Sequence, residues 1–389
     1  MMPAELAFWM AILFVVYTYL GYPALMWGLG HISPRSTRIA PVMPTITVLI
    51  AAHNEEKQIA AKIENCLALT YPSQRLDLVV VSDGSTDRTV EIAGGYATRF
   101  PNRITVVSIP ARRGKANALN VGAALASGEI LLLADVRQRF DLTVAHMLAR
   151  NFAASEVGAV SGELILLDEG ATECQEGIGL YWRYEKALRK AESRFASTIG
   201  YTGAIAAVRR SLFTSLPEET LVDDLVMPLR VIARGYRVIF EPAARAIDQV
   251  SRTAGHEFPR KVRTLAGVLQ TLLHLRQFVG PLGFQAWWQF ASHKVFRLVV
   301  PYALMVALLT SAFMTGPFYR AALIAQLFAY TIGVVGLLLS RRSRWRRLTS
   351  PLSTFLILNL AVVFSTLWYL AGRRFELWQR ASAEEVIEA

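Results

Sequence analysis

The chain has 389 residues, of which 53% are hydrophobic and 18% charged, and its formal net charge is +11. The length exceeds that of one ordinary domain, and the apolar excess excludes a wholly water-soluble globular protein. A basic balance fits an anionic membrane surface, a nucleic acid or an anionic substrate. Because much of the arginine flanks apolar segments, we expect membrane lipids rather than nucleic acid as its partner.

The first apolar segment, Leu6 to Gly30, is long enough to cross a bilayer. No basic region precedes it, so we interpret residues 1–30 as a transmembrane helix rather than a signal peptide. Residues 31–44 contain three prolines and are expected to form a linker. Arg35 and Arg38 follow the apolar segment directly, and such residues favour the cytoplasmic side. We therefore expect a multi-pass protein of the inner (plasma) membrane, with the following domain in the cytoplasm.

Residues 45–263 alternate short β-branched runs with longer amphipathic segments, which predicts an α/β domain with a mainly parallel sheet covered on both faces. The expected strands are Ile46–Ala51, Leu78–Ser82, Ile104–Ser108, Ile130–Ala134, Gly158–Leu164 and Arg237–Phe240. The expected helices are Glu55–Leu69, Asp87–Arg99, Lys115–Ser127, Leu142–Ala153, Gly179–Phe195 and Asp224–Arg234. In such sheets, ligands bind beyond the carboxyl ends of the strands.

The remainder of the chain is predominantly apolar. Polar side chains interrupt residues 264–297, which predicts amphipathic helices in the membrane interface. Residues 298–372 predict three transmembrane helices: Leu298–Met314, Phe318–Leu339 and Leu352–Ala371. The basic loop at residues 341–347 should face the cytoplasm, which places the tail, residues 373–389, outside. Arg373 and Arg374 favour the opposite side for this tail, so its side of the membrane is left open.

Polar clusters follow the first two expected strands. His53, Asn54 and Glu55 come after the first, and Asp83 precedes Gly84 after the second. Helix caps and turns are the plainer interpretation of both clusters. Their place at the strand ends also suits a ligand site, where Asp83 would accept hydrogen bonds from a base or ribose.

Charged residues mark two further sites. Arg112, Arg113 and Lys115 stand at the start of an expected helix, where the helix dipole disfavours positive charge. A bound pyrophosphate would compensate these cations, and a solvated surface patch is the alternative. Asp135 ends a near-continuous apolar strand. A buried strand that delivers a carboxylate to the sheet edge suits a metal or nucleotide site.

The adjacent carboxylates Asp223 and Asp224 begin another expected helix. They are either caps or the source of a base that removes a proton from an attacking hydroxyl. Repulsion between neighbouring carboxylates raises the pKa of one of them towards a useful range. Further on, Arg260 and Arg263 would either anchor the chain to anionic lipids or neutralise a leaving diphosphate.

In this order, the motifs resemble the family-2 glycosyltransferases of the GT-A fold, a Rossmann-like nucleotide-sugar-binding domain. Cellulose synthase, hyaluronan synthase and poly-N-acetylglucosamine synthase are membrane-embedded members, and the resemblance covers about Pro44 to Arg263. It implies that the donor nucleotide is bound by His53, Asn54, Glu55, Asp83, Lys115 and Asp135. It also implies that Asp224 is the general base beside Asp223, that Thr202 and Gly203 face the acceptor, and that Arg260 and Arg263 approach the diphosphate.

The resemblance further implies an inverting transfer from a nucleotide-diphosphate sugar, with a UDP-sugar as the expected donor and Mg²⁺ or Mn²⁺ bound at Asp135. Two departures matter. Arg137 replaces the second acid of the family's D-x-D motif, so metal binding would depend on Asp135 and the diphosphate itself. The family's Q-x-x-R-W element reads Arg260-Lys261-Val262-Arg263-Thr264, and its missing glutamine and tryptophan argue against long-chain processivity.

Three functions remain open on the sequence. The chain would extend a growing polysaccharide, or add a single sugar to a lipid or lipid-linked acceptor. The third is a non-catalytic membrane scaffold subunit, which the lost D-x-D acid favours and the intact Asp223, Asp224 and Lys115 oppose. The sugar, the linkage and the oligomeric state are not predicted.

Overall fold

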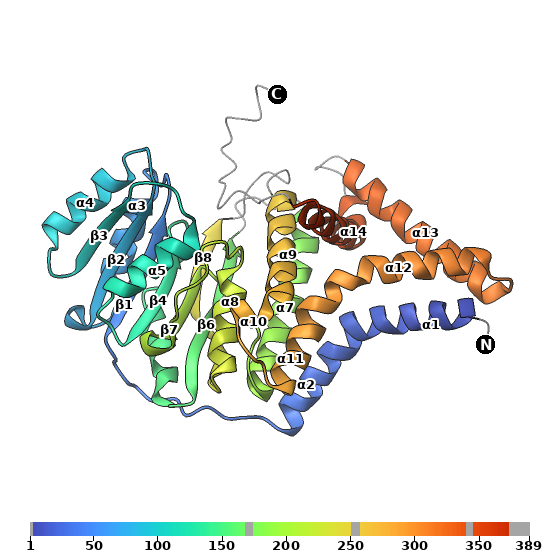
Figure 1. Ribbon diagram of the computed structural model, residues 1–389, viewed down its shortest axis with the longest axis horizontal. Coiled ribbons are helices and arrows are strands. Elements are labelled where there is room, and N and C mark those ends of the chain that lie inside the picture. The colour runs from blue at the N-terminus through green and yellow to red at the C-terminus, as the bar shows by residue number, and fades with distance from the viewer. Residues whose placement is uncertain (1–2, 168–173, 250–256, 340–344, 373–389) are drawn as a thin grey trace.

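The computed structural model describes residues 3–167, 174–249, 257–339 and 345–372. Within these ranges, eight strands form one sheet in the order β3-β2-β1-β4-β7-β6-β8-β5 (Figure 1). The strands are β1 (Ile46–Ala52), β2 (Leu76–Asp83), β3 (Ile104–Ile109), β4 (Ile130–Asp135), β5 (Arg139–Phe140), β6 (Val157–Leu167), β7 (Ile205–Arg209) and β8 (Arg237–Gln249).

Four of the seven strand pairings are parallel, as expected of a mainly parallel sheet, and the other three are antiparallel. Strand β1 runs parallel to β2 and β4, β2 to β3, and β6 to β8. Strand β7 is antiparallel to both β4 and β6, and β5 is antiparallel to β8. The sequence pattern missed β5 and β7 because they have two and five residues, too few for a clear alternation.

Helices cover both faces of the sheet, which explains the continuous apolar runs in its strands. Val48 and Ile50 of β1 face one core, and Leu49 and Ala51 face the other. The helices of this domain are α3 (Ile59–Leu67), α4 (Thr89–Arg99), α5 (Lys115–Leu125), α6 (Val144–Ala149), α7 (Cys174–Phe195) and α8 (Asp223–Ala233). Short 3₁₀ turns occupy Ser73–Arg75, Arg150–Ala153 and Arg210–Leu212.

The register of the parallel strands gathers the polar clusters at one sheet edge. Ala51 of β1 pairs with Val81 of β2 on one side and with Asp135 of β4 on the other. The residues that follow β1 and β2 therefore emerge beside Asp135. This is the edge at which the sequence motifs were expected to meet.

Four helices in the described ranges are long and apolar enough to cross a membrane: Pro3–Ile32, Phe284–Phe313, Pro317–Leu338 and Leu348–Leu370. The first joins α1 (Pro3–Val16) and α2 (Tyr22–Ile32) through a π-helical turn, Tyr17–Gly21. The second joins α11 (Phe284–Phe290) and α12 (Phe296–Phe313) through another, Ala291–Val295. The others are α13 (Pro317–Leu338) and α14 (Trp345–Leu370).

Helices α1, α12 and α13 extend away from the sheet on one side, and the linker after α2 runs along the domain to β1 (Figure 1). Large apolar side chains on these helices, such as Leu13, Ile324 and Phe328, are exposed, as expected of surfaces that face lipid. These observations fit a membrane protein with four apolar helices.

The segment expected at the interface, residues 264–297, is divided between several helices. Its first part belongs to α9 (Glu257–Leu273) and α10 (Leu275–Phe278), which precede the apolar helix. Residues 284–297 continue directly into α12, so the expected boundary at 297 falls inside one helix. Most of the basic loop, residues 341–344, and the tail, residues 373–389, lie outside the described residues.

Candidate active site

The loop after β2 supports the loop that leads into α5. Gly84 has φ +62°, and a Cβ there would lie 2.5 Å from the backbone nitrogen of Arg112, so only glycine fits. The carboxylate of Asp83 is 0% exposed and accepts the backbone N–H groups of Arg113 at 2.8 Å and Gly114 at 2.7 Å. Asp83 therefore positions the start of α5. Its expected contact with a base or ribose stays a prediction.

The residues after β1 meet those after β2, as the shared sheet edge predicted. His53 Nδ1 lies 2.6 Å from the carbonyl oxygen of Asp83. Asn54 has φ +52°, a conformation that asparagine tolerates, and its Oδ1 accepts the N–H of Thr86 at 2.8 Å. Glu55 is buried, and its backbone N–H donates to Thr89 Oγ1 at 2.7 Å. These hydrogen bonds are turn and cap contacts, as the plainer interpretation of the cluster predicted. The binding of a nucleotide by the same residues stays a prediction.

Lys115 joins the expected donor and catalytic residues. Its Nζ lies 2.8 Å from Asp135 Oδ1 and 3.5 Å from Asp223 Oδ2. Burial by itself would lower the pKa of Lys115, but the carboxylates of Asp135 and Asp223 more than offset it and raise that pKa above its usual value. Helix α5, strand β4 and helix α8 therefore converge on one ammonium group.

Asp224, next to Asp223, carries a carboxyl group of raised pKa. Burial and the neighbouring Asp223 carboxylate raise the pKa of Asp224 to about 6, against the opposing effect of Lys115, Arg189 and Lys294. A carboxyl with that pKa is ionised at neutral pH yet binds a proton more strongly than an ordinary aspartate.

Among the described residues, the buried hydroxyl of Tyr201 has no hydrogen-bond partner. Burial and the carboxylates of Asp223 and Asp224 raise the pKa of Tyr201 well above its usual value, so this hydroxyl is held protonated.

The loop before β7 closes the site. Gly203 faces Asp224 and Lys115: a Cβ there would lie 3.4 Å from Asp224 Cβ and 3.6 Å from Lys115 Nζ. Any larger side chain at this position would fill the space between the ammonium and the base. Two hydrogen bonds position Thr202. Its Oγ1 accepts one from Arg189 at 3.0 Å, and its N–H donates the other to Ser161 Oγ at 3.0 Å.

Arg260 and Arg263 lie on the first part of α9. Helix α9 packs on the loop before α8, where a Cβ at Gly267 would lie 2.7 Å from a methyl group of Val222. Arg263 is one turn before Gly267 and so shares its face. Arg260 is exposed. Their expected contact with the diphosphate remains a prediction.

The residues around Asp135 do not form an ordinary metal site. In the part of the chain that is described, no group of three His, Cys, Asp or Glu side chains could hold a metal ion. Lys115 engages Asp135. Arg137 stands at the second D-x-D position, and its Nη2 lies 2.6 Å from Oδ2 of Asp248, a buried residue of β8. Of the two D-x-D positions, only that of Asp135 carries a carboxylate.

Sequence reasoning missed some residues of this region. Arg189 was not assigned a role, and Asp248 lies in the part of β8 beyond the expected strand end at Phe240. Local patterns carry no signal for them, because their roles arise from contacts between distant segments. Lys294 was placed in an interfacial helix, although it affects the base.

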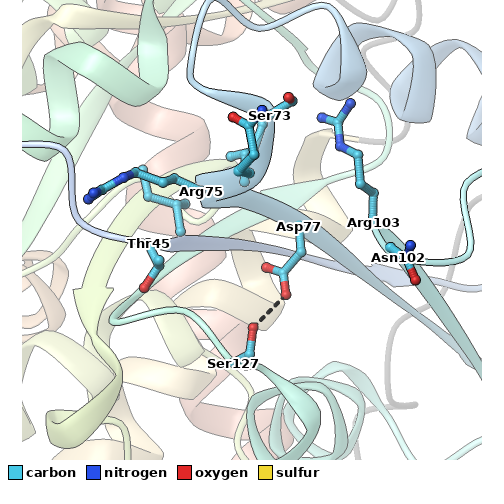
Figure 2. Close-up of a pocket in the computed structure, with 10 residues that line it drawn as sticks. Thr45, Ser73, Arg75, Asp77, Asn102, Arg103 and Ser127 are labelled. Carbon is cyan, nitrogen blue, oxygen red and sulfur yellow. Dashed lines mark hydrogen bonds between the residues drawn. The ribbon is translucent and has the colours of Figure 1, made fainter.

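A cleft of about 320 Å³ lies at the opposite edge of the sheet, by the amino-terminal ends of β1 and β2 (Figure 2). Thr45, Arg75 and Arg103 line it, and Asp77 accepts a hydrogen bond from Ser127 at 2.8 Å. None of the expected site residues contributes to it. Ligands of such sheets bind beyond the carboxyl ends of the strands, so we do not assign the donor site to this cleft.

Comparisons with known proteins agree with this architecture. The family model "Glycosyl transferase family 2" matches residues 47–216, and "Glycosyl transferase family group 2" matches residues 138–370. The chain belongs to glycosyltransferase family 2. The matched regions together include every expected site residue.

Two curated relatives of this glycosyltransferase are bacterial. It is 28% identical over 218 residues to the probable glycosyltransferase YdaM of Bacillus subtilis, covering 54% of this chain and 52% of that protein. It is 25% identical over 232 residues to the poly-beta-1,6-N-acetyl-D-glucosamine synthase of Staphylococcus aureus (strain COL), covering 59% and 55%. The chain thus spans about half the length of these relatives.

A solved structure establishes the fold. A mannosyltransferase of Pyrobaculum calidifontis, in complex with GDP-Man and Mn²⁺, superposes with a TM-score of 0.72 at 23% identity, covering 94% of this chain and 99% of that one. The expected GT-A fold of this glycosyltransferase is confirmed. The bound nucleotide sugar and metal are observations on that neighbour.

Proposed function

We propose that this protein is an inverting membrane glycosyltransferase that moves a sugar from a nucleotide-diphosphate sugar, with a UDP-sugar as the expected donor, to a growing polysaccharide. The observation that carries this proposal is the convergence of Lys115, Asp135 and the Asp223–Asp224 pair at the ligand edge of the sheet. A cation for the diphosphate and a carboxylate of raised pKa are the two groups that the reaction requires.

In the proposed reaction, Asp224 accepts the proton of the acceptor hydroxyl while the hydroxyl oxygen attacks the anomeric carbon. The bond from that carbon to the diphosphate breaks, and the electron pair leaves with the diphosphate. Lys115 stabilises the charge that develops on this leaving group. Gly203 leaves the room between Lys115 and Asp224 in which the reacting atoms would lie.

The role proposed for the expected Mg²⁺ or Mn²⁺ is smaller than in a complete D-x-D site. An ion that enters with the donor would find Asp135 as its protein ligand, beside the ammonium of Lys115. It would add positive charge at the diphosphate. Because the site lacks the second acid of D-x-D, none of the steps above is assigned to an ion.

The alternative acceptor is a lipid or a lipid-linked glycan that receives one sugar. The sequence Arg260-Lys261-Val262-Arg263-Thr264 on α9 favours this alternative, because it lacks the two residues typical of processive members. The similarity to a polysaccharide synthase supports the polymer. The size of the product made from labelled donor separates a ladder of polymers from a single addition.

We propose that the protein lies in the inner membrane and that its catalytic domain faces the cytoplasm. The basic residues after α2 support this side. An epitope in the domain should resist protease added to spheroplasts, in which the outer face of the inner membrane is accessible. Digestion from outside would contradict this arrangement.

Asp224→Asn tests the proposed base. It should lower transfer by about 10²–10⁴-fold, since the amide cannot accept the proton, while nucleoside diphosphate still binds. Asp77→Asn, at the opposite sheet edge, is the matched control and should retain transfer. Full transfer by Asp224→Asn would show that the assigned base is wrong. A wild-type protein that neither binds nucleoside diphosphates nor releases them from any nucleotide sugar would instead support the scaffold alternative.

A further inference from the structure

The segment between β4 and β5 presents an exposed arginine two residues after Asp135. Along residues 135–138 the side chains alternate: Asp135 is partly exposed, Val136 is buried, Arg137 is exposed and Gln138 is buried. Val136 and Arg137 form a bend directly after β4. Arg137 therefore reaches the solvent two residues after Asp135, at the second position of the D-x-D motif.

Arg137 is held in place by a buried carboxylate. Its Nη2 lies 2.6 Å from Oδ2 of Asp248, which is 4% exposed and also accepts from Gln138 Nε2 at 2.9 Å. The other oxygen of Asp248 is buried without a partner among the described residues. The Arg137 side chain itself remains 35% exposed. A buried anion thus fixes one end of a guanidinium that stays accessible.

Two cations are available to a diphosphate near Asp135. Lys115 lies 2.8 Å from Asp135, and Arg137 stands where the family's second metal-binding acid is expected. Both cations are paired with carboxylates, Lys115 with Asp135 and Asp223 and Arg137 with Asp248. A diphosphate would be attracted by both, and the planar guanidinium of arginine can donate two parallel hydrogen bonds to phosphate oxygens.

We propose that Arg137, positioned by Asp248, binds the donor diphosphate together with Lys115, so that nucleotide binding does not require a divalent ion. This inference rests on the proposed function, because it assumes a nucleotide-diphosphate donor. It differs in assigning to a side chain the charge that a metal ion supplies in a D-x-D site. Asp248 is a positioning residue that acts through Arg137.

The experiment is equilibrium binding of UDP and GDP to the purified full-length protein in lipid nanodiscs, once with EDTA and once with Mn²⁺. The wild type should bind its preferred diphosphate in EDTA within about 10-fold of its affinity in Mn²⁺. Arg137→Ala leaves the buried Asp248 charge uncompensated and risks misfolding. The double variant Arg137→Ala/Asp248→Asn removes both charges and is the main test, with Arg139→Ala as the control on a neighbouring exposed arginine.

The double variant should lose at least about 10-fold in metal-free affinity, the equivalent of one charge-assisted contact, and Mn²⁺ should restore part of that loss. Arg139→Ala should bind as the wild type does. If the pair is only a structural tie between β8 and the β4–β5 segment, the folded double variant will bind as tightly as the wild type in EDTA, which overturns the inference.

Two other results are decisive. Wild-type binding that disappears in EDTA and returns with Mn²⁺ overturns this inference but leaves the proposed function standing. Absence of binding to either diphosphate under both conditions removes the proposed function, and this inference falls with it.

Discussion

The backbone N–H of Tyr201 donates to the backbone carbonyl of Asp224 at 3.0 Å. This hydrogen bond ties the loop that contains Thr202 and Gly203 to the first turn of α8. The expected acceptor-facing loop and the proposed base therefore keep a fixed separation. Because Lys115 contacts the neighbouring Asp223 at 3.5 Å, the expected donor side is joined to the same unit.

The pH dependence of transfer should report on Asp224. Its pKa is raised to about 6, so the carboxylate is protonated and inactive below that pH and ionised above it. We expect kcat/KM to rise about tenfold per pH unit below pH 6 and to level off above it. Arg189 lowers the pKa of Asp224, so Arg189→Gln should move this limb to higher pH. Arg183→Gln, on the exposed side of α7, should leave it unchanged, and an unshifted limb in both variants would contradict the assignment.

Asp83→Asn should weaken donor binding without changing base selectivity. The amide oxygen can accept one of the two backbone N–H groups that Asp83 now binds. The amide NH₂ group would face the other N–H, and two donors cannot form a hydrogen bond. We expect a loss of about 1–3 kcal/mol in stability and a lower affinity for nucleoside diphosphates, because Lys115 is displaced. Binding of UDP and GDP should fall by the same factor. A change in their ratio would show that Asp83 contacts the base.

Gly84→Ala should destabilise the protein and weaken nucleotide binding. The added Cβ would lie 2.5 Å from the Arg112 nitrogen, at a φ that alanine rarely adopts. We expect a loss of about 1–3 kcal/mol in the free energy of unfolding. Gly95→Ala is the matched control: it lies in α4 with nothing within 4 Å of a built Cβ, so it should stabilise by about 0.5–1 kcal/mol. Equal effects of the two substitutions in thermal unfolding would refute this interpretation.

Glu185→Gln should loosen the junction between the catalytic domain and the apolar helix 284–313. The buried Glu185 of α7 contacts Arg297 and lies 3.1 Å from Nε2 of His293. Removing its charge leaves a buried arginine without that counterion, at a cost of about 3–5 kcal/mol. The double variant Glu185→Gln/Arg297→Met should recover much of this loss. Thermal unfolding in detergent measures both, and additive effects of the two single substitutions would argue against direct coupling.

The sequence by itself determined the apolar helices and much of the domain. Each strand of the first half is an apolar run that stops at a polar cluster, so its ends and the shared edge follow from local patterns. Asn54 and Gly84 both have positive φ angles, which asparagine tolerates and glycine adopts readily. These features depend on neighbouring residues only, which is why periodicity and turn chemistry could reveal them.

Tertiary structure decided which of these residues meet. Insertion of β7 between β4 and β6 brings residues 201–203 to Asp224, and five residues of β7 carry too little pattern to predict that placement. The approach of Asp223 to Lys115 and the pairing of Arg137 with Asp248 join positions more than 100 residues apart. Such contacts depend on strand order and register, which local propensity does not encode. The carboxylate partners of Lys115 and Arg137 therefore became apparent only in the folded chain.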